Sequence, residues 1–219
     1  MVSLLRMALF CLLPLGIGCL DPAYASQLQV EVTGPDGSPL SDAVVYLEGA
    51  FTRSPAPEKP IEVRQEGKQF VPFLIAVQAG SKVVFPNKDP FSHSVYAIAA
   101  AKSFELPLFK GSDPLPPPVT FDKPGKVTLG CNIHDSMVAY IFVVDTPYLF
   151  VTGADGQAKI SAPDGTYEVR IWHPRMKEKE GKIIEAKIEL NGPRRLSAKL
   201  ELPPATKKNS NPFGKGKSY

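Results

Sequence analysis

The chain has 219 residues, of which 43% are hydrophobic and 21% charged, with 23 prolines and a formal net charge of +3 at pH 7. This length allows one large or two small domains. The charge is nearly balanced and the basic excess gathers at the end, which argues against a dedicated nucleic-acid surface. The proline content and the apolar fraction favour a loop-rich β protein with a hydrophobic core.

Residues 1–25 have the features of a cleaved signal peptide. A basic start precedes an apolar run over residues 7–20, and Ala23-Tyr24-Ala25 supplies the small-x-small cleavage pattern. The run is short for a membrane span, so we expect a mature chain that starts at Ser26, lies in the periplasm and has no transmembrane segment. A lipidated N-terminus at Cys19 is the less favoured alternative, because glycine stands where such sites usually carry leucine.

Alternating apolar and polar residues, separated by turn motifs, predict strands along the mature chain. No stretch has a convincing helical period, so the sequence predicts an all-β fold. The run 138–144 is continuously apolar and is expected to be buried on both faces. The runs expected to form strands are 28–32, 43–47, 70–77, 81–85, 94–98, 103–109, 119–121, 126–129, 138–144, 148–152, 157–160, 166–172, 182–190 and 195–202.

Changes in composition divide the mature chain. Residues 51–67 are predicted to be a linker, because their prolines lack the amide hydrogen that a helix or a β ladder needs. Residues 204–219 are rich in Lys, Asn, Ser and Gly and are expected to be a disordered basic tail. Residues 68–146 then form a central block, flanked by 26–50 and 147–203.

Potential metal ligands are concentrated in the segment between Cys131 and Met137. A thiol, the His134 imidazole and a thioether lie within these seven residues, and His93 precedes an earlier predicted strand. Two histidines, one cysteine and a weakly bound methionine are the ligands of a type-1 copper site. Zinc fits less well, because structural zinc needs four strong ligands and a thioether is a poor one. The sequence predicts one copper ion per chain, bound by His93, Cys131, His134 and Met137.

Each of these ligands has a plainer alternative. Without the signal peptide, Cys131 is the only cysteine, and a lone thiol is most often a buried core residue; in an exported protein, however, it is open to oxidation unless a metal occupies it. His93 could be a surface histidine, and Met137 could fill the core. His173 is predicted to be structural. A copper enzyme is disfavoured, because further copper centres need several more histidines and His173 alone remains.

Two motifs resemble a known family. One is the Asn-x-Asp…His loop of Asn87, Asp89 and His93, and the other is Cys-x-x-His-x-x-Met from Cys131. On these motifs residues 68–144 resemble the cupredoxins, which include plastocyanin, pseudoazurin and amicyanin. The short second spacing is most like amicyanin, and the segments around both motifs are also similar to periplasmic plastocyanin-type proteins labelled methylamine-utilisation proteins.

The cupredoxin resemblance implies a Greek-key sandwich that binds one type-1 copper ion through the four predicted ligands. Cupredoxins usually have asparagine directly after the first ligand histidine, where it ties the two ligand loops together. This chain has Ser94 there, and its hydroxyl is able to make a similar bond.

The flanking segments resemble a second family. Residues 37–45, the Asp155-Gly156 pair and residues 163–167 are similar to a carboxypeptidase-regulatory-like, or Cna-B-type, sandwich. The resemblance implies that residues 26–50 and 147–203 together form a seven-stranded, Ig-like β-sandwich. The cupredoxin domain would then be inserted after its second strand, and the sandwich would close only when both ends of the chain meet.

The cupredoxin resemblance implies a periplasmic one-electron carrier rather than an enzyme, with His134 passing the electron to protein redox partners. The first alternative is a copper chaperone or store without redox turnover, although the Met-rich or His-rich tracts common in such proteins are missing from the sequence. The second is a structural or binding module in which the flanking sandwich does the work. We expect a monomer without a nucleic-acid partner.

Overall fold

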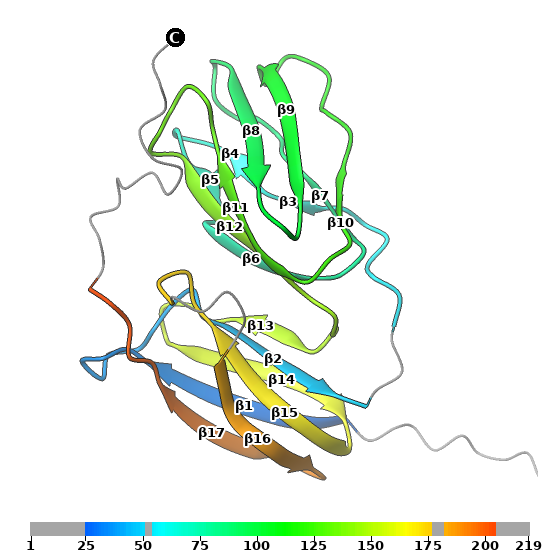
Figure 1. Ribbon diagram of the computed structural model, residues 1–219, viewed down its shortest axis with the longest axis vertical. Helices are drawn as coiled ribbons and strands as arrows, with labels where there is room; N and C mark the ends of the chain where they lie inside the picture. Colours follow the sequence, from blue (N-terminus) through cyan, green and yellow to red (C-terminus); the bar gives the residue numbers. More distant parts are fainter. Residues whose placement is uncertain (1–24, 51–53, 177–181, 205–219) are drawn as a thin grey trace, which may run out of the picture.

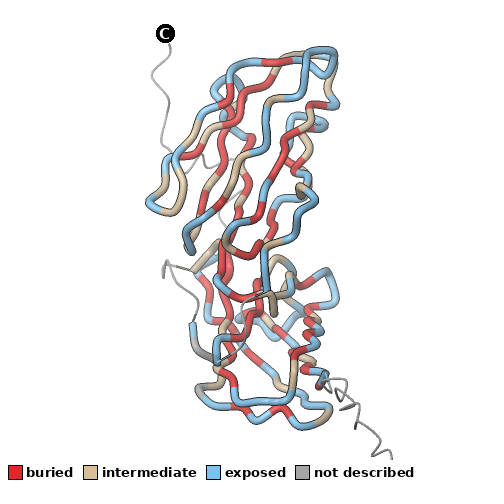
Figure 2. Tube along the Cα trace, turned by 90° about the vertical axis from the view of Figure 1, so that its right-hand side faces the viewer, coloured by how far each residue is buried: buried red, intermediate tan, exposed pale blue. Residues whose placement is uncertain are grey.

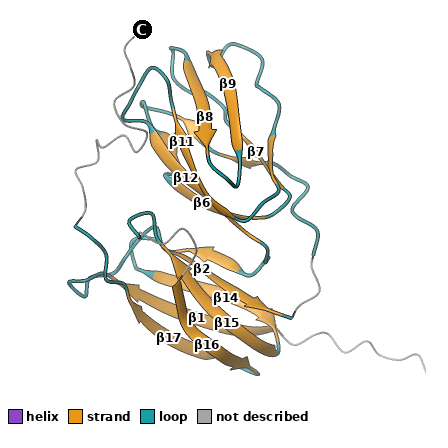
Figure 3. Ribbon diagram, in the orientation of Figure 1, coloured by secondary structure: helices purple, strands orange, loops and turns teal. Residues whose placement is uncertain are grey.

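The computed structural model describes residues 25–50, 54–176 and 182–204. All regular elements in these ranges are strands, as Figure 3 shows, which confirms the predicted all-β fold. The described residues contain no helix long and apolar enough to cross a membrane. Residues 1–24 of the predicted signal peptide lie outside these ranges, as does nearly all of the predicted tail.

The strands follow the predicted runs closely, with two short additions. The described strands are β1 (Ala25–Thr33), β2 (Val44–Gly49), β3 (Ile61–Glu62), β4 (Arg64–Gln65), β5 (Phe70–Val71), β6 (Leu74–Gln78), β7 (Ser81–Val84), β8 (His93–Ile98), β9 (Ser103–Phe109), β10 (Val119–Phe121), β11 (Gly125–Gly130), β12 (Val138–Val144), β13 (Leu149–Val151), β14 (Gln157–Pro163), β15 (Gly165–Trp172), β16 (Lys182–Leu190) and β17 (Arg194–Lys199).

The strands form two groups of sheets, one above the other in Figure 1. The flanking sheets have the strand orders β14-β1-β17 and β13-β2-β15-β16. The inserted sheets have the orders β10-β7-β3 and β6-β12-β11-β8-β9, together with the ribbon β4-β5. β1 lies antiparallel to β14 and parallel to β17, so its sheet forms only when the start of the described chain meets its end.

Each group of sheets has its own hydrophobic core, visible as buried segments in both halves of Figure 2. In the flanking sheets, Leu28, Val30 and Val32 alternate along β1 with more exposed residues. Since side chains alternate between the faces of a strand, these three point inward, where Val45 and Ile171 of the facing sheet belong to the same core. The two-residue period in the sequence thus determines the inner face.

β12 has an apolar sequence because both of its faces are buried, as the sequence predicted. Ala139, Ile141 and Val143 line the core of the inserted sheets. On the opposite face, Phe142 stacks on Trp172 of the flanking sheets, with ring centroids 4.4 Å apart. This strand therefore joins the two groups of sheets.

The linker predicted over residues 51–67 is too long. β3 and β4 lie inside that range; β3 pairs with β7 and β4 pairs with β5. Two-residue strands have no alternation that a sequence pattern could reveal. The single strand predicted over residues 70–77 is likewise divided between β5 and β6 around Pro72, which has no amide hydrogen to give to a ladder.

Candidate metal centre

The predicted ligands come from two segments of the inserted sheets. His93 begins β8, whereas Cys131, His134 and Met137 belong to the loop between β11 and β12, here called the ligand loop. β8 and β11 are antiparallel neighbours in one sheet. The start of β8 therefore meets the end of β11, at the end of the inserted sheets that lies away from the flanking sheets (Figure 1).

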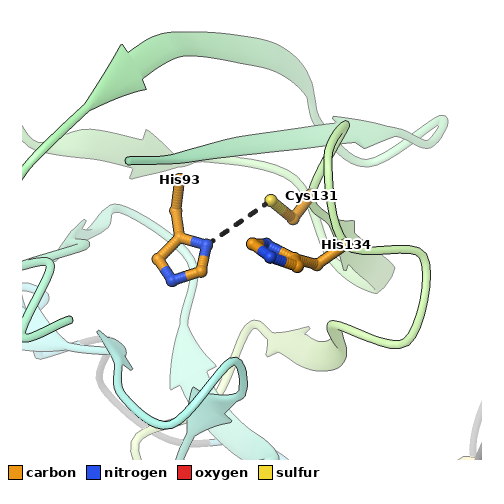
Figure 4. Close-up of side chains that lie close together, drawn as sticks. All are labelled: His93, Cys131 and His134. Atoms are coloured by element: carbon orange, nitrogen blue, oxygen red, sulfur yellow. Dashed lines mark hydrogen bonds between the residues drawn. The ribbon is translucent and has the colours of Figure 1, made fainter. Parts of the chain in front are cut away.

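Figure 4 shows the side chains of His93, Cys131 and His134 close together. One potential ligand atom from each lies within 4.8 Å of the others, the one such cluster in the described part of the chain. Cys131 Sγ lies 3.8 Å from Nδ1 of His93, and the centroids of the His93 and His134 rings are 5.0 Å apart. His93 and Cys131 are buried, whereas His134 is partly exposed. The structure thus brings three of the four predicted ligands together.

Met137 lies on the same loop and is buried in the same core as Cys131. Its backbone N–H donates to the carbonyl of His134 at 2.9 Å, a turn that holds the methionine close in the chain to the histidine. Burial fits a core-filling residue and an axial ligand equally well, so the axial role stays a prediction.

The chemistry of the three donors fits a soft metal ion. Nδ1 of His134 is buried and has no hydrogen-bond partner among the described residues. Such an atom costs about 1–3 kcal/mol when left unpaired, and a bound metal would remove that cost. Burial lowers the pKa of His134, and the neighbouring His93 and Lys68 lower it further, against a smaller opposite effect of Asp89. The neutral imidazole, which is the form that binds metals, is therefore favoured.

Ser94 ties β8 to the ligand loop. Its buried hydroxyl accepts the backbone N–H of Asn132 at 2.9 Å and lies 3.9 Å from Cys131 Sγ. The sequence suggested that serine could replace the loop-tying asparagine of the cupredoxins, and the structure contains such a bond. The thiol is thus held from its own loop and from β8.

Sequence reasoning treated Asp89 only as part of a motif and missed its contact with the centre. Its Oδ2 lies 2.8 Å from Nε2 of His93. Burial raises the pKa of Asp89, but hydrogen bonds from the Lys68 amide, the His93 ring and the Gly67 amide outweigh it and hold the pKa below its usual value. A carboxylate four residues before a predicted ligand histidine was the available signal, because ligand histidines commonly bond a second group.

Phe91 lies over both histidines. Its ring centroid is 5.1 Å from that of His93 and 5.8 Å from that of His134. The ammonium Nζ of Lys68 lies 5.4 Å from the same Phe91 centroid. These ring contacts make Phe91 a packing residue of the centre.

His173 lies apart from this cluster, directly after β15. It is buried, and its Nδ1 accepts the backbone N–H of Arg175 at 3.1 Å. Burial and then the charge of Arg175 lower the pKa of His173 to about 4. A neutral, buried and hydrogen-bonded histidine fits the structural role that the sequence predicted.

No protein-family model and no curated protein matches this chain. Among solved structures, a reduced mutant of amicyanin is 18% identical over 46% of this chain and 98% of its own, with a TM-score of 0.36. A purple cupredoxin from Nitrosopumilus maritimus is 20% identical over 36% of this chain and 85% of its own, with a TM-score of 0.31.

A Cu-containing nitrite reductase from Thermus scotoductus SA-01 is 25% identical over 45% of this chain, with a TM-score of 0.38. This chain spans 26% of that enzyme. All three similarities are confined to less than half of the chain. The assignment of the metal centre therefore depends on its own residues.

Proposed function

We propose that the chain is a type-1 copper protein of the cupredoxin family that carries single electrons between protein partners in the periplasm. The observation that carries this proposal is the convergence of one thiol and two imidazoles within 4.8 Å. The thiol and one imidazole lie on a loop that also holds a buried methionine. Two histidines, a cysteine and a weak axial methionine are the ligands of electron-transfer copper sites.

The three donors would hold the ion, and Met137 would be the weak axial ligand. Copper supplies a one-electron couple when bound, and these ligands suit both of its oxidation states. The chain's own residues keep the donors in place, since His93 begins a sheet strand and Ser94 ties that strand to the ligand loop. Little rearrangement would then accompany a change of charge.

The partial exposure of His134 supports a route in which the electron passes through this residue to a partner protein. Cys131 and His93 are buried, so His134 is the one of these three ligands that a partner protein could approach directly. The chain has three histidines in all, and two of them lie in this centre. That number supports a carrier rather than an enzyme, because a second copper centre would need several more.

The flanking sheets belong to the same proposal. Their seven strands come from the two ends of the described chain, in sheets of three and four strands. This arrangement supports a Cna-B-type sandwich made of residues 26–50 and 147–203, with a cupredoxin domain inserted between them. In this proposal the cupredoxin domain begins before residue 68, so that it includes β3 and β4.

The experiment is a redox titration of the mature protein after addition of one equivalent of Cu(II), with a Cu(I)-specific chelator present. We expect one electron per copper, complete recovery on reoxidation and no copper in the chelator. Release of copper on reduction would instead indicate a copper chaperone or store. Failure to bind copper would leave the flanking sheets as the functional part.

A further inference from the structure

We propose that Asp89 and the turn Gly67–Lys68 form a brace that sets the tautomer and the orientation of His93. The inference rests on the proposed function only in taking Nδ1 of His93 as a metal ligand. It adds the β4–β5 hairpin, residues 64–71, to the centre, and the first half of that segment was assigned to a linker from the sequence. Asp89 is thereby a positioning residue, acting on the metal through His93.

The contact between Asp89 and His93 selects one form of the imidazole. His93 has 0% exposure, and the Asp89 side chain is 9% exposed, so water does not compete freely for either group. Nε2 of His93 lies 2.8 Å from the carboxylate Oδ2 of Asp89. An ionised carboxylate accepts hydrogen bonds and cannot donate them. This geometry favours the neutral tautomer that carries its proton on Nε2, in which Nδ1 presents its lone pair toward Cys131 Sγ, 3.8 Å away.

The carboxylate is itself held by a hairpin turn. The Gly67 N–H donates to Oδ1 of Asp89 at 2.8 Å, and the Lys68 N–H donates to Oδ2 at 3.0 Å. Both turn residues are left-handed, with φ of 62° and 56°, between Glu66 and Gln69, which bond each other in both directions. Two successive amides directed at one anion form a small anion-binding nest. The β4–β5 hairpin thus supplies that nest to Asp89.

Asn87 fixes the backbone of the same loop. Its Oδ1 accepts the Asp89 N–H at 2.9 Å, and its Nδ2 donates to the carbonyls of Phe91 and Phe109, also at 2.9 Å. The loop before β8 is therefore anchored at both of its ends. The main chain and the carboxylate of Asp89 are both fixed before any metal binds.

The hairpin and the His93 loop are joined independently of the carboxylate. The N–H of Gln65 donates to the carbonyl of Pro86 at 2.9 Å, and the N–H of Lys88 donates to the carbonyl of Gln65 at 2.8 Å. Removing the carboxylate should therefore leave the two segments together. What is lost is the acceptor of Nε2, and with it the preference for one tautomer.

The first experiment uses the mature protein without metal. Nitrogen-15 NMR of the histidine side chains should show His93 as the Nε2–H tautomer in the wild type. Asp89→Ala should give a mixture of tautomers, and Asp89→Asn, which keeps one acceptor oxygen, should recover the wild-type tautomer in part. The matched control is Asp113→Ala, because Asp113 also accepts a loop amide, that of Lys110 at 2.7 Å, and takes part in none of the hydrogen bonds described above for the centre.

The second experiment measures metal affinity by competition with a chelator. Loss of a hydrogen-bond partner of a ligand histidine typically costs about 10–100-fold in affinity. We expect a loss of that size for Asp89→Ala, a smaller loss for Asp89→Asn, and less than about 3-fold for the Asp113 control. Circular dichroism of each variant tests whether it folds, and Asp89→Asn is the milder change if Asp89→Ala does not.

The brace is wrong if wild-type His93 carries its proton on Nδ1. It is also wrong if folded Asp89→Ala keeps the wild-type tautomer and affinity. The metal-free measurement separates this inference from the proposed function. A wild-type Nε2–H tautomer in a protein that binds no copper would overturn the function and leave the brace standing.

Discussion

The indole of Trp172 stacks on the ring of Phe142, with centroids 4.4 Å apart and planes 10° from parallel. Trp172 ends β15 in the flanking sheets, and Phe142 lies in β12, the strand that follows the ligand loop. Tyr46 and Tyr140 pack against the same pair at 5.8 and 6.2 Å. The flanking sheets are thus packed against the inserted sheets at the end away from the metal centre (Figure 1), where His134 is partly exposed.

Trp172→Ala should destabilise the whole protein. Trp172 has 0% exposure, and truncation of a buried aromatic typically costs about 3–5 kcal/mol. Denaturant unfolding measures the loss, with Phe150→Ala as the control, because Phe150 is 38% exposed on β13. We expect the control to cost less than about 1 kcal/mol. Equal effects of the two variants would contradict a contact that stabilises the joined sheets.

Gly111→Ala should disturb the loop that carries Asp89. A Cβ at Gly111 would lie 2.6 Å from the carbonyl oxygen of Asn87, which is backbone and cannot rotate away. Overpacking of this kind typically costs about 1–3 kcal/mol. We expect that loss in denaturant unfolding, together with weaker metal binding.

The matched control for this change is Gly153→Ala. The nearest atom to its Cβ would be Asp155 Oδ1, at 3.6 Å, an ordinary contact. We expect stability and metal affinity close to those of the wild type. If Gly111→Ala behaves like this control, the loop before β8 is not held as tightly as its hydrogen bonds indicate.

The stability of the metal-free protein should depend on pH through His173. Its pKa is lowered from 6.5 to about 4 in the folded protein, first by burial and then by Arg175. The unfolded chain therefore binds the proton more readily, so the stabilisation is complete above pH 6.5 and is lost as pH falls toward 4. In His173→Gln this part of the pH dependence should disappear.

Denaturant unfolding of wild type and His173→Gln at pH 7 and pH 4.5 tests this expectation. Other groups titrate alike in both proteins, so the difference between the two isolates His173. The stability advantage of the wild type should shrink at the lower pH. An advantage that stays constant would show that His173 is protonated as easily in the folded protein as in the unfolded one.

Ser94→Ala should weaken the tie between β8 and the ligand loop. It removes the acceptor of the Asn132 N–H and the one hydroxyl near Cys131 Sγ that the structure describes. Loss of such a bond costs about 0.5–1.5 kcal/mol. A hydrogen bond to the sulfur favours the reduced state, so the reduction potential of the copper-loaded variant should fall.

Voltammetry of the copper-loaded protein measures that potential. Ser103→Ala is the control, because the Ser103 hydroxyl bonds the carbonyl of Ala97 instead of a group of the centre. Its potential should match the wild type. An unchanged potential in Ser94→Ala would mean that the serine positions the loop without acting on the sulfur.

Long periodic segments made most of the fold readable from the sequence. β1 alternates because one face is buried. β12 is apolar on both faces because one lines the core of the inserted sheets and the other packs against the flanking sheets. β3 and β4 were missed, because strands of two residues carry no period and their pairing partners lie elsewhere in the chain.

The candidate site was predictable to a similar degree. Sulfur and imidazole side chains are rare enough that Cys131, His134 and His93 stood out, and the structure brings them together. Asp89 did not stand out, since aspartate is common in loops and its bond to His93 depends on a turn at Gly67 and Lys68. The residues that hold a ligand in place are thus harder to find than the ligand.

The central claim is that Cys131 and the two histidines form a redox-active copper centre. The most direct measurement is the visible absorption spectrum of the mature protein with one equivalent of Cu(II), beside Cys131→Ser. The account predicts an intense blue or green charge-transfer band that bleaches with ascorbate and is absent from the variant. A colourless wild-type protein, or a band that survives in Cys131→Ser, would contradict it.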